Sequence, residues 1–167
     1  MKWYDIDRLV ERTPFADPNV VYVFHFYDPF IFTHQGSPWV QMGSTHDVPY
    51  PYSQDRWPKH MLDLGFTELN PQWQLDQLHE YHRKGNHDAL RNRLIQVKKW
   101  AVKNNVPLIC NEFGVYDASA RKEDVVRYYR DLIGLFGELE IPWQVWFMTM
   151  DPETGKVDPE LREAFRL

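Results

Sequence analysis

The stretch Val106-Pro107-Leu108-Ile109-Cys110-Asn111-Glu112-Phe113-Gly114-Val115-Tyr116 decides the fold of this chain. Its short apolar run after Pro107 is typical of a parallel strand that is buried on both faces. The run ends abruptly in a carboxylate, Glu112, between an amide and an aromatic ring. In α/β proteins, functional groups gather at the carboxyl ends of parallel strands. The stretch therefore predicts a candidate functional acid, although a solvated loop residue is the simpler interpretation of one strand end taken alone.

A second strong strand is predicted at residues 19–27, which are rich in β-branched and aromatic side chains. Because side chains alternate along a strand, Val23, His25 and Tyr27 should share one face. A lone histidine in a strand is usually a satisfied core residue. A histidine and a tyrosine two residues apart, at the end of the strand, favour a functional interpretation.

Helical and strand patterns alternate along the chain. Helices are predicted at residues 5–10, after residue 71, at residues 90–101 and 125–136, and from Asp158 onward, with a third strand at residues 142–148. Strands that alternate with helices indicate parallel βαβ units, so the predicted fold class is α/β. Between the first strand and the later helices, residues 28–71 form a long aromatic excursion, which we expect to be a cleft wall rather than a solvated linker.

Composition limits the partners and the chemistry. The formal net charge of -5 disfavours nucleic acid and anionic membranes as partners. The single cysteine excludes an intrachain disulfide and a cysteine-based zinc cluster. Aromatic residues make up 16% of the chain, including seven Trp and nine Tyr, which suits a cleft that stacks on sugar rings.

Three parallel strands would bring four side chains to one edge of the sheet: His25, Tyr27, Glu112 and Trp146. A tyrosine hydroxyl and an imidazole that contact a carboxylate hold it ionised and in one orientation. Such a carboxylate suits a nucleophile or a general base better than a general acid. The indole of Trp146 offers an apolar plane for a sugar ring.

These motifs resemble those of glycoside hydrolase family 5, the cellulase-type family built on a (β/α)8 barrel. The matching segments are residues 23–29, residues 32–36 with Trp39, residues 110–114, and Trp143 with Trp146. They occur in the order of the family and span nearly the whole chain. The resemblance implies one domain over residues 1–167, a partial or half TIM barrel that corresponds to barrel strands six to eight with their flanking helices.

The resemblance also implies roles for individual residues. Glu112 is the expected catalytic nucleophile, with His25 and Tyr27 as its catalytic neighbours on the preceding barrel strand. The expected substrate-binding residues are Trp146, Trp39, His34, Gln35 and Asn111. The implied activity is endoglucanase-like hydrolysis of a β-1,4-glucan polysaccharide or oligosaccharide, without a metal or organic cofactor. The family is typically secreted or periplasmic, although no apolar signal-peptide region follows Met1.

The sequence departs from the family at the second catalytic group. The acid/base glutamate of the family lies in an Asn-Glu-Pro sequence, which is absent here, as are barrel strands one to five. A complete barrel needs about 250 residues. Hydrolysis with retention needs a second carboxyl about 5–5.5 Å from the nucleophile. Asp151 is one candidate, although an aspartate before Pro152 is more often part of a turn.

A partial barrel would expose strand edges and inner side chains to water, so we expect a homo-oligomer, most simply a two-fold dimer that pairs strand edges or covers the open face. The alternative function is a catalytically impaired fragment that binds oligosaccharide or serves as a folding and assembly unit. His79 and His82 do not form a His-Glu-x-x-His motif, so a metal site is disfavoured. No Gly-x-Ser-x-Gly sequence supports a serine hydrolase.

Overall fold

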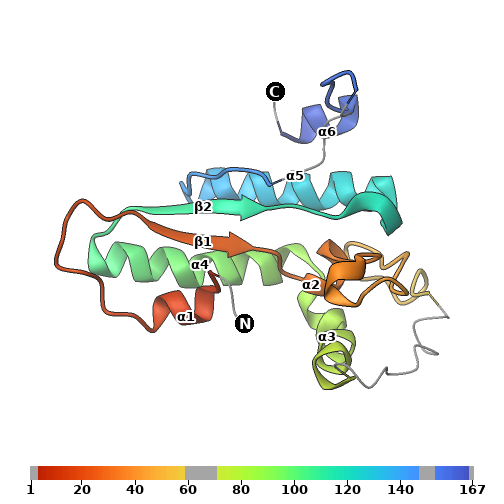
Figure 1. Ribbon diagram of the computed structural model, residues 1–167, viewed down its shortest axis with the longest axis horizontal. Coiled ribbons are helices and arrows are strands. Elements are labelled where there is room, and N and C mark those ends of the chain that lie inside the picture. Colours follow the sequence, from red (N-terminus) through yellow and green to blue (C-terminus); the bar gives the residue numbers. More distant parts are fainter. Residues whose placement is uncertain (1–3, 59–70, 147–152, 166–167) are drawn as a thin grey trace.

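Two parallel strands form the centre of the computed structural model, which describes residues 4–58, 71–146 and 153–165. Strands β1 (Tyr22–Phe26) and β2 (Leu108–Phe113) lie side by side and point in the same direction (Figure 1). Helices α3 (Pro71–Lys84) and α4 (His87–Asn104) lie between them in the sequence. A parallel pair needs such a crossover connection. The predicted α/β class with parallel strands is therefore confirmed.

The third predicted strand, residues 142–148, is reduced to an isolated bridge in the described residues. Trp143 forms a parallel bridge with Cys110, and the backbone N–H of Trp146 donates to the carbonyl of Phe113 at 2.9 Å. The segment lies parallel to β2, as predicted, but it does not form the regular strand that was predicted. The segment follows the edge of the sheet, where a single ladder supports it. The last two residues of the predicted strand lie outside the described part of the chain.

Four further helices complete the described fold. They are α1 (Ile6–Val10), α2 (Phe30–Thr33), α5 (Lys122–Glu138) and α6 (Pro159–Ala164). Helices α1 and α6 start at side-chain caps, because Asp5 accepts a hydrogen bond from the Asp7 N–H and Asp158 accepts one from the Glu160 N–H. Within the described residues, no helix has the length and apolar character needed to cross a membrane.

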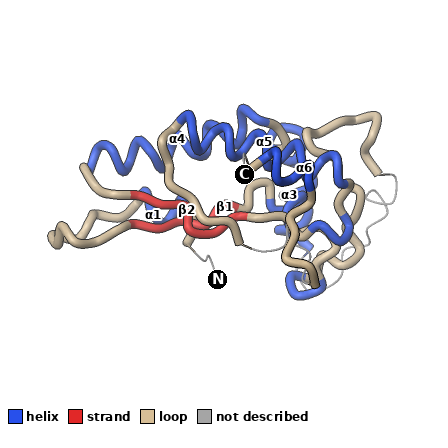
Figure 2. Tube along the Cα trace, turned by 90° about the horizontal axis from the view of Figure 1, so that it is seen from above, coloured by secondary structure: helices blue, strands red, loops and turns tan. Residues whose placement is uncertain are grey.

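The two faces of the sheet have different surroundings. Tyr22, Phe24 and Phe26 are buried, whereas Val23 and His25, on the opposite face, are only half-buried. Helices α4 and α5 lie on one side of the strands, and no described helix covers the strands from the other side (Figure 2). Strand β2 also alternates between buried and half-buried residues. The prediction that this strand is buried on both faces was therefore wrong, because helices cover one face only.

The long excursion after β1 packs against the loop that follows β2. The Tyr116 N–H donates to the Thr33 carbonyl at 2.8 Å, and the Asp47 N–H donates to the Ser119 carbonyl at 3.1 Å. Ser119 ends a short 3-10 helix, η3 (Asp117–Ser119), and a second one, η1 (Pro38–Val40), lies in the excursion itself. The described part of the excursion is therefore fixed to the residues that follow β2, and the cleft wall stays a prediction.

Gly36 allows this close packing, and its replacement by alanine tests it. Gly36 has a φ of +78°, and a Cβ atom there would lie 2.0 Å from the Ser119 Oγ. We expect Gly36→Ala to lower the free energy of unfolding by about 2 kcal/mol or more, because it combines left-handed backbone strain with a clash. Gly43→Ala is the matched control, since nothing lies within 4 Å of a Cβ built at Gly43. Equal urea midpoints for the two variants would contradict this packing.

Candidate active site

The pairing register of β1 and β2 breaks at Asn111. Phe24 pairs with Cys110, but the next pair along the ladder is His25 with Glu112. Strand β2 thus has one residue more than β1 at this point, which is a β-bulge. Bulges re-aim side chains and are frequent next to active sites.

The bulge decides the face on which Glu112 lies. Regular alternation from Leu108 and Cys110 would put residue 112 on the buried, helix-facing side of the sheet. The extra residue instead places Glu112 beside His25 and returns Phe113 to the core, where it is 0% exposed. The half-buried residues 111 and 112, adjacent in the sequence, mark the interruption in the burial pattern. The acid therefore reaches the open face of the sheet because β2 is irregular.

Both carboxylate oxygens of Glu112 contact the chain segment at the end of β1. The Tyr27 hydroxyl donates a hydrogen bond to Glu112 Oε1 at 2.6 Å. The Nε2 of His25 lies 3.3 Å from Glu112 Oε2. The predicted contacts of a tyrosine hydroxyl and an imidazole with this carboxylate are therefore confirmed. The Glu112 side chain remains 28% exposed, so a ligand can approach it.

The two neighbours of Glu112 are neutral near pH 7. Burial and the hydrogen bond to Glu112 raise the pKa of Tyr27 well above its ordinary value, so the hydroxyl keeps its proton. Burial lowers the pKa of His25, and the nearby Glu112 charge opposes this shift without cancelling it. The carboxylate is therefore oriented by neutral polar groups. A carboxylate oriented by neutral groups keeps its negative charge available for attack on an electrophile.

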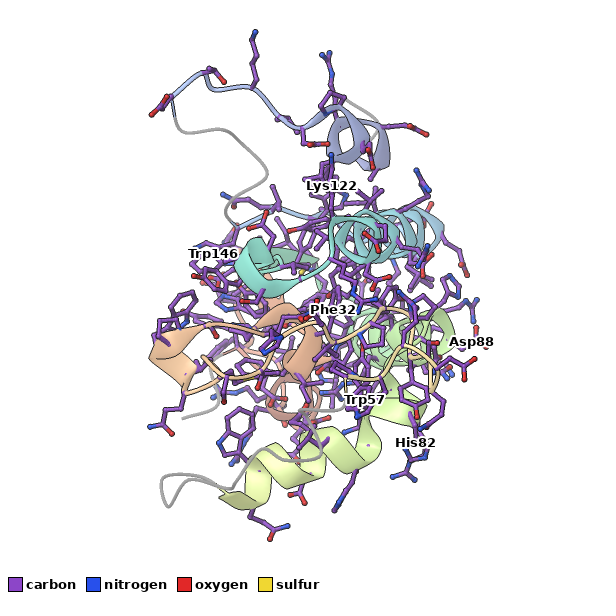
Figure 3. All side chains as sticks on the ribbon, turned by 90° about the vertical axis from the view of Figure 1, so that its right-hand side faces the viewer. Phe32, Trp57, His82, Asp88, Lys122 and Trp146 are labelled. Atoms are coloured by element: carbon purple, nitrogen blue, oxygen red, sulfur yellow. The ribbon has the colours of Figure 1, made fainter. Side chains whose placement is uncertain are left out.

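Trp146 lies next to this group. Its ring meets the Tyr27 ring edge-on, with centroids 6.1 Å apart, and the residue is 44% exposed. Both strands point toward the side from which Figure 3 is viewed, and Trp146 lies beside the last residue of β2, because its N–H donates to the Phe113 carbonyl. A Cβ atom at Gly114 would lie 2.4 Å from the Trp146 carbonyl oxygen, so the glycine permits this approach. An exposed indole beside a carboxylate can stack against a sugar ring.

Two other predicted residues are placed at different depths. Trp39 is 54% exposed and meets the Tyr116 ring edge-on at 4.8 Å. His34 is only 8% exposed; it stacks on Phe30 at 3.9 Å and meets Tyr27 edge-on at 4.8 Å. Trp39 is therefore accessible to a ligand, whereas His34 supports the Tyr27 ring from within the protein.

Gln35 and Asn111, both predicted to bind substrate, have buried polar atoms. Gln35 is 0% exposed, its amide nitrogen donates to the Phe32 and Val48 carbonyls, and its amide oxygen accepts from the Val48 N–H. The prediction that Gln35 contacts substrate was therefore wrong, because its polar atoms bind the backbone of the excursion instead. The Asn111 Oδ1 atom is buried in the bulge and has no hydrogen-bond partner within the described residues.

Sequence reasoning missed Tyr4 and Tyr116. The Tyr4 ring stacks on the imidazole of His25, with centroids 4.4 Å apart. No motif indicated Tyr4, because this contact depends on the path of the chain before α1. Tyr116 lies in the stretch that ends β2, and its position next to the strand end was the only available signal.

The remaining candidate residues either have contacts that indicate a structural role or lie outside the described residues. Cys110 is buried, and burial raises the pKa of its thiol to about 12, as expected for an inert cysteine. His82 Nδ1 lies 2.8 Å from the His79 carbonyl oxygen, and the described residues include no cluster of three or more potential metal ligands. Asp151, considered as a second catalytic carboxyl, lies outside the described part of the chain.

A carboxylate with an adjacent aromatic plane, at the carboxyl ends of parallel strands, is the class of site that glycoside hydrolases use. The family model "Cellulase (glycosyl hydrolase family 5)" matches residues 2–151, so the chain belongs to this family. It is 36% identical over 166 residues to Endoglucanase 3 of Fibrobacter succinogenes, covering 98% of this chain and 25% of that protein. It is 32% identical over 155 residues to Endoglucanase C of Acetivibrio thermocellus, covering 91% of this chain and 43% of that protein.

Solved structures show the same fold. The cellulose synthase subunit Z from Clostridioides difficile has a TM-score of 0.72 and 21% identity, covering 97% of this chain and 46% of that one. A hyperthermophilic endo-β-1,4-glucanase, solved in complex with substrate, has a TM-score of 0.70 and 24% identity, covering 99% of this chain and 45% of that one. The chain thus spans less than half the length of these relatives and solved structures.

The burial of His34 predicts a pH dependence of stability. Burial lowers its pKa to about 4, against about 6.5 in an unfolded chain. Below pH 6.5 the unfolded state therefore binds a proton that the folded state does not, and stability falls as the pH falls toward 4. The expected loss from this group between pH 7 and pH 5 is about 2 kcal/mol.

Urea unfolding of the wild type and of His34→Gln at both pH values measures this effect. The variant should lose less stability than the wild type on going from pH 7 to pH 5, because glutamine does not titrate. The same pH dependence in both proteins would contradict the assignment.

Proposed function

We propose that this chain carries the nucleophile of a cellulase-type glycoside hydrolase that acts on β-1,4-glucan. The observation that carries the proposal is the placement of Glu112, whose two carboxylate oxygens contact Tyr27 and His25 on the open face of the sheet. Membership of the cellulase family and the similarity to endoglucanases support the substrate class. Trp146 and Trp39 are the proposed sugar-contacting residues, since both rings are exposed.

The proposed reaction has two steps. A carboxylate oxygen of Glu112 attacks the anomeric carbon while the glycosidic bond breaks, and a general acid protonates the departing oxygen. Water, which gives its proton to the group that served as the acid, then attacks the same carbon and releases the Glu112 carboxylate. The Tyr27 hydroxyl holds Oε1, while His25 lies against Oε2, so the carboxylate cannot rotate freely as the bond forms. No step requires a metal or an organic cofactor.

The second carboxyl has three candidate sources. The family's Asn-Glu-Pro sequence is absent from this sequence, and Glu112 itself is assigned to the nucleophile. A retaining mechanism needs the acid about 5–5.5 Å from Glu112. The candidates are Asp151, a second copy of the chain, and a segment that completes the barrel.

We also propose that the half-buried face of β1 and β2 is the inner face of an incomplete (β/α)8 barrel. The one-sided cover of α4 and α5, and the similarity to less than half of longer structures, support this interpretation. A dimer that covers the open face would bury Val23 and Ile109, which are half-buried in the single chain. Light scattering coupled to size exclusion should give twice the mass of 20.1 kDa. A compact monomer at all protein concentrations would contradict the proposed dimer.

Replacement of Glu112 tests the nucleophile. We expect Glu112→Gln to lower turnover of an activated aryl β-cellobioside by about a thousandfold or more, since the amide cannot form the glycosyl ester. The activated leaving group hardly needs an acid, so the test does not depend on the second carboxyl. Glu123→Gln, on the exposed start of α5, is the matched control and should keep wild-type turnover. Equal turnover in the two variants would contradict the assignment.

The second candidate function is an oligosaccharide-binding or assembly unit without turnover. The exposed rings of Trp39 and Trp146 support it, because stacking on a sugar ring needs no catalytic carboxyl. Calorimetric titration with cello-oligosaccharides distinguishes the two functions. Binding of equal affinity by the wild type and Glu112→Gln, with no turnover in either, would select this second function.

A further inference from the structure

We propose that Tyr4 is a positioning residue for His25, whose ring and backbone carbonyl together fix the imidazole against the Glu112 carboxylate. The inference deepens the proposed function, since it rests on Glu112 as the reacting group. Tyr4 belongs to none of the motifs that indicated the site.

Two independent contacts join Tyr4 to the same residue. The Tyr4 and His25 rings are stacked, with centroids 4.4 Å apart and planes at 18°. The backbone N–H of His25 donates to the Tyr4 carbonyl at 3.0 Å. Position and ring orientation of His25 are thus both restrained by one residue at the edge of β1.

The backbone of Tyr4 is itself unusual. Its φ is +47°, in the left-handed region, where a residue other than glycine is uncommon. Part of the reason is local, because the next residue, Asp5, caps α1 and the chain must turn to reach it. That turn needs the backbone conformation but not a ring. Glycine would satisfy the turn at lower cost, so the aromatic ring requires a separate explanation.

The surroundings of His25 supply this explanation. The Tyr4 ring covers one face of the imidazole, Glu112 Oε2 lies 3.3 Å from Nε2, and the Tyr27 ring lies edge-on at 6.4 Å. His25 is half-buried and alternates along β1 with the buried Phe24 and Phe26, so it belongs to the opposite face of the strand. Without the Tyr4 ring, water would reach this face of the imidazole, and the ring would lose the contact that restricts its rotation.

The variants Tyr4→Gly and Tyr4→Phe separate the ring from the backbone. Glycine keeps the left-handed turn and the carbonyl that binds the His25 N–H, but removes the stack. Phenylalanine keeps the stack and removes only the hydroxyl. Nuclear magnetic resonance of the histidine rings, with His25→Gln to assign the signal, follows the titration of His25 in each protein.

Burial lowers the pKa of His25, and Glu112 raises it. Removal of the stacked ring should therefore raise the His25 pKa in Tyr4→Gly above that of the wild type. Tyr4→Phe should titrate as the wild type does. Circular dichroism and urea unfolding should show an intact fold in both variants, because glycine fits the turn.

An unchanged His25 titration in a folded Tyr4→Gly variant would overturn the proposal, as would an equal shift in Tyr4→Phe. If Tyr4→Gly does not fold, Tyr4→Asn replaces it, since asparagine also tolerates the left-handed region. This readout requires no turnover. Failure of the nucleophile would appear in Glu112→Gln, whereas failure of the Tyr4 proposal would appear only in the histidine titration.

Discussion

The extra residue in β2, at Asn111, is the constraint on which the site depends. It shifts the pairing of β2 with β1 so that Glu112 lies opposite His25 and Phe113 lies opposite Phe26. Two requirements are thereby met at one strand end, since an aromatic ring stays in the core and the neighbouring carboxylate reaches the open face. The contacts to Tyr27 and His25 form only because of this shift.

The end of β1 is held from several directions. Arg93 on α4 pairs with Asp7 on α1 and with Asp28, the residue after Tyr27. The Thr33 Oγ1 donates to the Tyr27 carbonyl at 2.7 Å. Since these contacts hold the Tyr27 carbonyl and the residue that follows it, they fix the backbone from which the Tyr27 hydroxyl reaches Glu112. The helix layer thus supports a site that opens on the opposite face of the sheet.

Much of the fold could be predicted from local patterns. The helices α4 and α5 have long apolar periodicities, the Asp158 cap marks the start of α6, and β1 and β2 are rich in strand-forming residues. The irregular elements could not be predicted in this way. Helix α2 is a single apolar turn without a period, and the segment at Trp143 has one neighbouring strand among the described residues.

The residues of the candidate site could be predicted better than their geometry. The motif placed His25, Tyr27, Glu112 and Trp146 together, and the contacts of the first three are confirmed. The bulge was not predictable, because strict alternation assigns Glu112 to the buried face. Gln35 and Tyr4 depend on how distant loops fold back, which no local pattern encodes. The sequence therefore identified the acid, while the packing of loops decided which residues surround it.

Covalent labelling of Glu112 tests the central claim most directly. A 2-deoxy-2-fluoro-β-cellobioside with an activated leaving group should form a slowly hydrolysed glycosyl ester with the nucleophile. Mass spectrometry of the digested protein should locate the added mass on the peptide that contains Glu112, and deletion of Asn111 should abolish the label because it removes the bulge. A label on another carboxylate, or an undiminished label after the deletion, would contradict the account.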